Sequence, residues 1–250
     1  MTIKVYWTRS VPGYEDLAMI GSSSNEYMSP MRLIEPVPLL KEIDYKDFFG
    51  PAVSRCPAII DDLKNIFVIK SPISITLKIF PNRLDVEQQS IEFAKAFFGP
   101  PQGKPGIHQL GFGYLFFSEK NLVATQLPAY YSQNDFTDKT FAISGSFDIG
   151  QWYRPMAKPA FIFKPGSSSV TISEGDPLLY IKFNTSEKVQ LVEFDDVEFS
   201  KLGEKSPEFL CGTLKKQSTS VMSLEKCYQY FNAFRMRRKI LKLIKGNEIK

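Results

Sequence analysis

Residues 141–199 carry the clearest fold signal in the chain, and they read FAISGSFDIGQWYRPMAKPAFIFKPGSSSVTISEGDPLLYIKFNTSEKVQLVEFDDVEF. This stretch contains short segments rich in Val, Ile and aromatic residues, which pack well on a pleated strand surface. The turn sequences KPGSSS, SEGDP and NTSEK separate the segments at spacings typical of a β-sandwich or barrel. The pattern predicts strands at residues 141–144, 160–163, 170–172, 178–183 and 189–194.

Upstream segments continue the same pattern. Alternating or apolar runs predict strands at residues 3–7, 67–70 and 73–80, and a hairpin formed by residues 108–117 and 122–126 around the sequence SEKN. A short helix is expected over residues 41–49, because Gly50 and Pro51 follow it as a stop signal. The expected fold class is mainly β, with α+β content: an antiparallel β-sandwich or jelly-roll-like body.

The C-terminal region differs in kind from the rest of the chain. Apolar residues recur at helical spacing after Ser223, and they predict a helix from Leu224 to Lys245 that ends at Gly246. The residues that set this spacing are Leu224, Cys227, Tyr228, Phe231, Phe234, Ile240, Leu241 and Ile244. Because all-β architectures of this length commonly form one domain, we expect a single β-rich domain over residues 1–214 and a helical appendage over residues 215–250.

Charge and cysteine usage bear on the compartment. The net charge of the chain is +4, but residues 215–250 hold ten Lys or Arg and two Glu, so a basic tail follows a mildly acidic body. The start of the chain lacks the basic and apolar regions of a secretory signal, and no apolar run has membrane-spanning length. The three cysteines are too few and too scattered for a disulfide framework. We therefore expect a protein that is cytoplasmic, not secreted and without a membrane span.

Metal and cofactor chemistry finds little support. The chain has one histidine, His108, so a facial triad of two histidines and a carboxylate is excluded by counting. Asp195, Asp196 and Glu198 form either an oxygen-only Mg²⁺ or Ca²⁺ site or, in the favoured interpretation, a solvated turn. Phosphate-binding loop motifs are absent, and we expect no metal and no cofactor.

A candidate ligand pocket combines Trp152, Arg154, Asp176 and His108. Trp152 and Arg154 either line this pocket or lock a corner of the fold, and the structural role is favoured. Between Glu174 and the next strand, Gly175 suits a positive φ and Asp176 is expected to bond the backbone two residues further on. His108 is either a hydrogen-bonded structural residue or a base for the Cys56 thiolate.

The basic residues of the predicted helix are candidate partner-binding residues: Arg235, Arg237, Arg238, Lys239, Lys242 and Lys245. Such a run neutralises the phosphates of a nucleic acid or the headgroups of an anionic membrane, or contacts a protein partner, or is the solvated face of a helix whose apolar side packs on the body or on a partner. We expect a protein partner or self-association through this helix, with nucleic acid as the alternative.

Three segments resemble a family of proteins of unknown function encoded by tailed bacteriophages. They are CPAIIDDLKNIFVIKSPISI at 56–75, WYRP at 152–155 and EGDPLLYIKF at 174–183, and the resemblance extends to about Leu210. It implies a phage origin and a location in the host cytoplasm or the virion, and it brings no catalytic residue. The expected function is a non-enzymatic structural or interaction role. The alternatives are a small-molecule or nucleotide-modifying enzyme with a pocket near Trp152 and Arg154, and nucleic-acid binding through the basic helix.

Overall fold

The computed structural model describes residues 2–8, 34–43, 48–51, 54–80, 83–87, 107–110, 114–151, 160–194, 229 and 235–249. Within these residues the chain is mainly β, with several sheets whose strand pairs are antiparallel except one, and a helix near the C-terminus. The predicted fold class is confirmed at this level.

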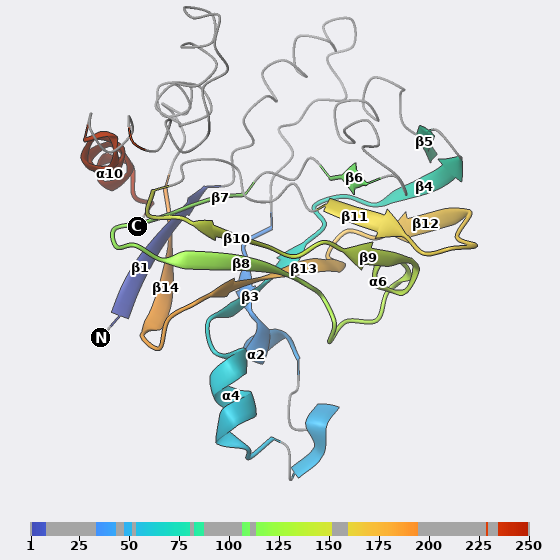
Figure 1. The fold of residues 1–250 in the computed structure, drawn as a ribbon, viewed down its shortest axis with the longest axis horizontal. Helices are drawn as coiled ribbons and strands as arrows, with labels where there is room; N and C mark the ends of the chain where they lie inside the picture. Colours follow the sequence, from blue (N-terminus) through green and yellow to red (C-terminus); the bar gives the residue numbers. More distant parts are fainter. Residues whose placement is uncertain are drawn as a thin grey trace, which may run out of the picture.

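Two sheets form the centre of the molecule (Figure 1). The five-stranded sheet has the order β10 (Gly145–Asp148), β8 (Val123–Pro128), β13 (Pro177–Phe183), β3 (Ile66–Lys70) and β2 (Val37–Pro38). The three-stranded sheet has the order β14 (Lys188–Glu193), β1 (Thr2–Thr8) and β7 (Leu115–Ser118). Strand β1 pairs with β14 in parallel and with β7 in antiparallel orientation.

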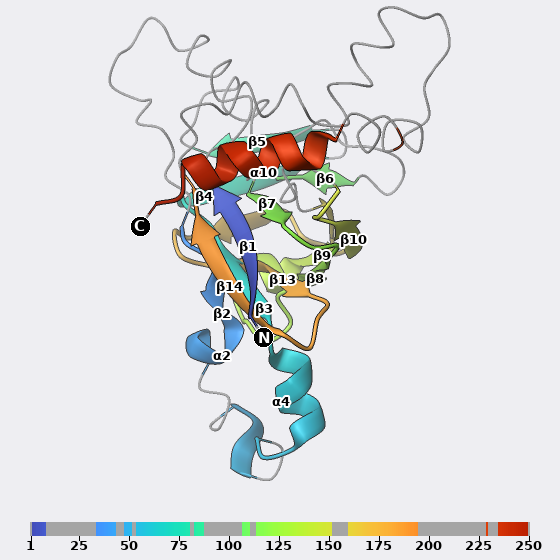
Figure 2. The ribbon, with the colours of Figure 1, turned by 90° about the vertical axis from the view of Figure 1, so that its left-hand side faces the viewer.

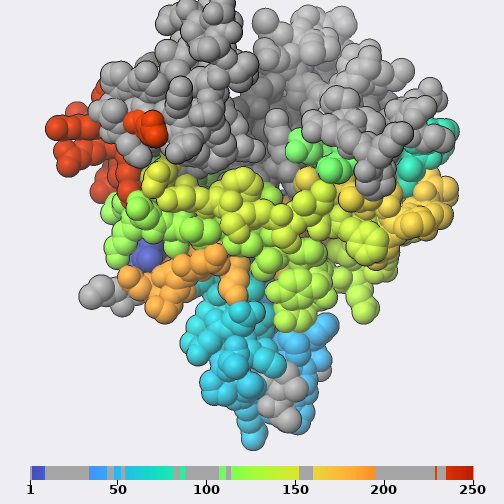
Figure 3. All heavy atoms as spheres, viewed as in Figure 1, coloured from blue at the N-terminus to red at the C-terminus, as the bar shows by residue number. Residues whose placement is uncertain are grey.

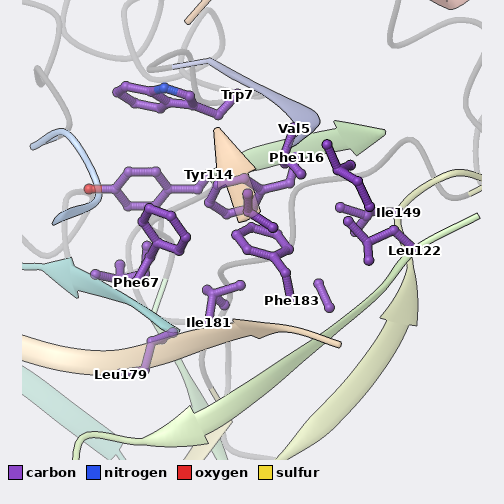
Figure 4. Close-up of a cluster of buried hydrophobic side chains, with 14 residues drawn as sticks. Val5, Trp7, Phe67, Tyr114, Phe116, Leu122, Ile149, Leu179, Ile181 and Phe183 are labelled. Carbon is purple, nitrogen blue, oxygen red and sulfur yellow. The ribbon is translucent and has the colours of Figure 1, made fainter. Parts of the chain in front are cut away.

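The two sheets share the largest hydrophobic cluster (Figure 4). From the three-stranded sheet come Val5, Trp7 and Phe116, and from the five-stranded sheet come Ile181 and Phe183. Alternate side chains of a strand point to opposite faces, so one face of each strand supplies this core and the other face is free to pack elsewhere. The result is a sandwich of two sheets.

Helices cover the outer faces of both sheets. Helix α10 (Met236–Gly246) packs on the three-stranded sheet, where Ile240 and Ile244 join Tyr6 and Phe117 in a second cluster (Figure 2). Helices α2 (Leu39–Glu42) and α4 (Pro57–Leu63) pack on the opposite side, against the outer face of the five-stranded sheet. The centre of the molecule is therefore layered as helix, sheet, sheet and helix.

Two further three-stranded sheets share another core. The first has the order β6 (His108–Gln109), β11 (Ala160–Phe163) and β9 (Thr140–Ala142). The second has the order β12 (Ser169–Ile172), β4 (Ile75–Phe80) and β5 (Arg83–Glu87). Short helix α6 (Asp135–Lys139) begins at a capping box in which the Asn134 side chain accepts the Thr137 N–H at 2.9 Å. Phe136 of this helix packs with Phe161 and Val170 in the core.

The strands predicted within residues 141–199 are confirmed to within a few residues as β9, β11, β12, β13 and β14. Strands β1, β3 and β4 also lie where the pattern predicts them. Gly175 has the expected positive φ of 87° in the turn before β13. Strand β10 and helices α4 and α6 were not predicted.

The predicted hairpin is wrong. Strand β7 pairs with β1, whereas β8 pairs with β10 and β13, so residues 119–122 carry the chain from one sheet to the other. All four residues of β7 are buried, because the strand has the central core on one face and helix α10 beyond the other. Burial on both faces removes the alternation that would distinguish such a strand from one half of a surface hairpin.

Both predicted helix ranges need correction. Ile43 is extended, with φ −102° and ψ 137°, so α2 ends there and the predicted helix over residues 41–49 is not continuous. Arg235 is left-handed, with φ 53° and ψ 34°, and α10 begins after it. A single helix from Leu224 to Lys245 is therefore excluded, because a left-handed residue breaks the right-handed backbone path. The expected domain boundary at residue 214 lies outside the described residues and stays a prediction.

Candidate functional site

The candidate site is the outward face of helix α10. The helix buries Met236, Ile240 and Ile244, which are spaced four residues apart and point to the sheet below. Because 3.6 residues complete a turn, Arg238, Lys239 and Lys242 are turned away from that sheet, and all three are exposed. Figure 3 shows the red helix at the surface of the molecule.

Two of the six basic side chains bind the body of the protein. Arg237 Nη1 donates a hydrogen bond to Asn121 Oδ1 at 2.7 Å, and its Nη2 donates to the Glu119 carbonyl oxygen. Lys245 Nζ lies 2.7 Å from Glu119 Oε1. Both contacts reach the link between β7 and β8, so these two residues hold the helix in place.

The other four basic residues are Arg235, Arg238, Lys239 and Lys242, and we call them the basic face. All four are exposed, and none makes an ion pair within the part of the chain that the structure describes. The spacing of Arg238, Lys239 and Lys242 places these three on one side of the helix, and Arg235 directly precedes the first turn. They form a solvent-exposed cationic surface without a compensating acid.

Glu119 is the anchor of the helix. Its carboxylate also accepts a hydrogen bond from the Tyr6 hydroxyl at 2.8 Å. The hydrogen bonds from Lys245 and Tyr6 lower the pKa of Glu119 below its usual range, while burial and the bond to Glu119 raise the pKa of Tyr6. Strand β1, the β7–β8 link and α10 therefore meet at one carboxylate.

Residues of the predicted ligand pocket are only partly described. Trp152 and Arg154 lie outside the described residues. The Asp176 carboxylate accepts the Ser173 N–H at 2.7 Å, and its carbonyl accepts the Ser71 N–H at 2.9 Å. The expected bond of Asp176 to the backbone two residues further on is wrong, because its carboxylate turns back and closes the turn before β13 instead.

His108 lies on β6 and is only 8% exposed. Its ring centroid lies 5.2 Å from that of Phe163 and 5.9 Å from that of Phe161. Its Nδ1 atom is buried and has no hydrogen-bond partner among the described residues, and burial lowers the pKa of the imidazole. The contacts of His108 and those of Asp176 thus involve different partners, and among the described residues nothing joins the two in one site.

The described residues neither join the candidate nucleophile Cys56 to a base nor form a metal site. Cys56 is half-buried at the start of α4, where its carbonyl accepts backbone bonds from Ile59 and Ile60, and it makes no described contact with His108. Asp195, Asp196 and Glu198 lie outside the described residues. Among the residues that are described, no group of three or more His, Cys, Asp or Glu is arranged to hold a metal ion.

An aromatic cluster on the α2 and α4 side was not anticipated from the sequence. It contains Phe48, Phe49, Tyr130, Tyr131 and Tyr180, with neighbouring ring centroids 4.4–6.3 Å apart. Phe48 is 52% and Tyr130 48% exposed, so the cluster reaches the surface. The adjacent tyrosines at 130 and 131 were the available signal, but their ring partners lie far away in the sequence.

Comparison of the chain with protein-family models, with curated proteins and with solved structures found no match in any of the three. Of the helices that the structure describes, none combines the length and apolar character needed to cross a membrane.

Proposed function

We propose that this protein is a non-enzymatic interaction protein, of phage origin, that binds an anionic partner through the basic face of α10 in the host cytoplasm or the virion. The observation that carries the proposal is the separation of roles on one helix. Arg237 and Lys245 bind the body, whereas the basic face is exposed and has no acidic partner among the described residues.

The packing of α10 determines which surface a partner meets. Because Ile240 and Ile244 are fully buried against β1 and β7, the apolar side of the helix is occupied within the chain itself. A partner or a second copy that approaches α10 therefore meets cations. Two copies of this face repel each other, which disfavours self-association through it and favours a partner of opposite charge.

The helix also presents its charges in a fixed arrangement. Its apolar side and the Glu119 anchor hold the backbone on the sheet, so little backbone ordering is left for the moment of binding. Preorganisation of this kind raises affinity because less conformational entropy is lost on association.

Charge reversal tests the proposal. The variant Arg238→Glu with Lys242→Glu is measured by fluorescence anisotropy against two labelled polyanions, polyglutamate and an oligonucleotide. We expect the wild type to bind at least one of them, and the variant to bind it at least about tenfold more weakly, since each surface charge contact contributes up to about 1 kcal/mol.

The matched control is Lys41→Glu with Lys64→Glu, which changes the net charge equally but lies on the opposite helical layer. The proposal fails if the wild type binds neither polyanion. It also fails if the control weakens binding as much as the basic-face variant does, because net charge alone then explains the affinity.

A further inference from the structure

We infer that the anionic partner of the basic face is the phosphate backbone of a nucleic acid, contacted without recognition of base sequence. This inference rests on the proposed function and names the chemistry of its partner. The sequence alone favoured a protein partner over a nucleic acid. The composition of the exposed surface of α10 reverses that preference.

The exposed surface of α10 has no apolar centre. Its exposed positions are Arg238, Lys239, Lys242, Lys245 and Gly246, with Arg235 directly before the helix. No large apolar side chain within α10 is exposed. Protein interfaces bury a core of apolar or aromatic side chains in which most of the binding energy is concentrated. A phosphate backbone requires no such core, because cations that displace condensed counterions supply the affinity.

The spacing of the charges suits an extended polyanion. Arg238 and Lys242 lie on successive turns, about 6 Å apart along the axis at 1.5 Å per residue, and Arg235 directly precedes the first turn. A row of this length places several cations along a strand of phosphates at once. The face carries only Arg and Lys, which contact phosphates whatever the base sequence, and the comparison of two duplexes below tests whether they also read guanine edges.

Acidic groups near the helix do not neutralise the positive charge of the basic face. Glu119 is bound to Lys245 and Tyr6, and Glu248 lies 3.8 Å from Lys4. Each of these carboxylates is already paired with a cation outside the basic face. The basic face therefore keeps its full charge for an external ligand.

A salt titration tests the inference. Full-length protein is titrated into two fluorescein-labelled 20-base-pair duplexes of unrelated sequence between about 50 and 200 mM salt. Over this range the affinity that comes from phosphate contacts falls steeply. With four contacts, the plot of log K against log salt has an expected slope of about −3.6, from −0.9 for each contact. The two duplexes are expected to bind equally within about twofold, as phosphate contacts carry no sequence information.

The variants Arg238→Gln and Lys242→Gln each remove one contact. Each is expected to reduce the slope by about 0.9 and to weaken binding to both duplexes alike. The control Lys41→Gln, which lies on the opposite helical layer, leaves slope and affinity unchanged. Circular dichroism of all variants establishes that the fold is intact.

The outcomes separate the inference from the proposed function. Binding to polyglutamate that depends on the basic face, with no binding to either duplex, overturns the inference and leaves the proposed function standing. Binding to neither overturns both. Duplex binding whose slope is unchanged in both basic-face variants, or that differs more than about tenfold between the two sequences, also overturns the inference.

Discussion

Asn65 connects parts of the chain that are more than one hundred residues apart. It has a left-handed backbone with φ 60°, and its side-chain amide donates to the Thr185 carbonyl at 3.0 Å and the Glu187 carbonyl at 2.8 Å. Its side-chain oxygen accepts the Val189 N–H at 2.9 Å. One residue therefore closes the link between α4 and β3 and also supports the turn between β13 and β14.

Two replacements of Asn65 separate the contribution of its side-chain hydrogen bonds from that of its left-handed backbone. Asn65→Ala is expected to lower the free energy of unfolding by about 2–4 kcal/mol, through lost hydrogen bonds of about 1 kcal/mol each and a left-handed backbone that Ala tolerates poorly. Asn65→Gly loses the same bonds without the backbone strain, so it is expected to be the less destabilising of the two. Urea denaturation measures both, and equal stability of the two variants would show that backbone strain is unimportant here.

His108 makes the stability of the protein depend on pH. Because burial lowers its pKa in the folded state, the unfolded chain binds the proton more tightly than the folded chain does. The contribution of neutral His108 is complete above its ordinary pKa of 6.5 and is lost as the pH falls through the folded-state value. The ring packs between aromatic neighbours, so phenylalanine is a suitable replacement without a titrating group.

We expect the thermal midpoint of the wild type to fall from pH 7 to pH 5 more steeply than that of His108→Phe. Subtraction of the two profiles removes the contribution of all other groups. Parallel profiles would contradict the assignment, as would a wild type that becomes more stable on acidification relative to the variant.

Among the helices and strands, α10 owes its position to the sheet face that it covers. It lies along the outer face of the three-stranded sheet and buries Tyr6, Leu115 and Phe117 there (Figure 2). As an isolated peptide α10 would have little helical stability, because isolated helices shorter than about 12 residues are marginal in water. Packing on the sheet, rather than local propensity, therefore holds the basic face in place.

Ile240→Ala tests this dependence. Ile240 is fully buried, so the variant is expected to lose about 2–5 kcal/mol of stability, the usual cost of truncating a buried isoleucine. The neighbouring Lys239→Ala, on the exposed side, is expected to change stability by less than about 0.5 kcal/mol. Chemical denaturation gives both values, and similar small losses in the two variants would mean that α10 does not contribute to the folded core.

At the scale of the whole molecule, strand β13 joins the separate cores. Leu178 belongs to the cluster of the two outer sheets, Leu179 to the central cluster, and Tyr180 to the cluster under α2 and α4. Successive residues of one strand thus enter three clusters. None of these cores can lose its packing without disturbing a strand that the other two share.

The described body is therefore expected to unfold in a single cooperative transition. Far-ultraviolet circular dichroism follows the sheets, and tryptophan fluorescence of the variant Trp152→Phe, which keeps Trp7 alone, follows the central cluster. Coincident thermal curves from the two probes are the expected result. Two resolved transitions would show that the outer sheets unfold independently of the central sandwich.

The strands whose pattern is local could be predicted from the amino-acid sequence. Strands β11, β13 and β14 lie between turns of Gly, Pro, Ser and Asp, and those turn residues act through their own backbone preferences. The end of α10 at Gly246 was likewise predicted. The β7–β8 hairpin failed because long-range burial on both faces of β7 replaced the alternation that a hairpin shows.

Which of the basic side chains of α10 face solvent depends on long-range packing. The sequence shows six basic residues within eleven positions, and nothing in the local pattern distinguishes those that bind the body from those that face solvent. The partners of Arg237 are Asn121 and Glu119, which lie 116 and 118 positions away along the chain. No local pattern encodes contacts at that separation, because they depend on how α10 packs across β1 and β7. That packing turns Arg237 and Lys245 into anchors and leaves Arg235, Arg238, Lys239 and Lys242 facing solvent.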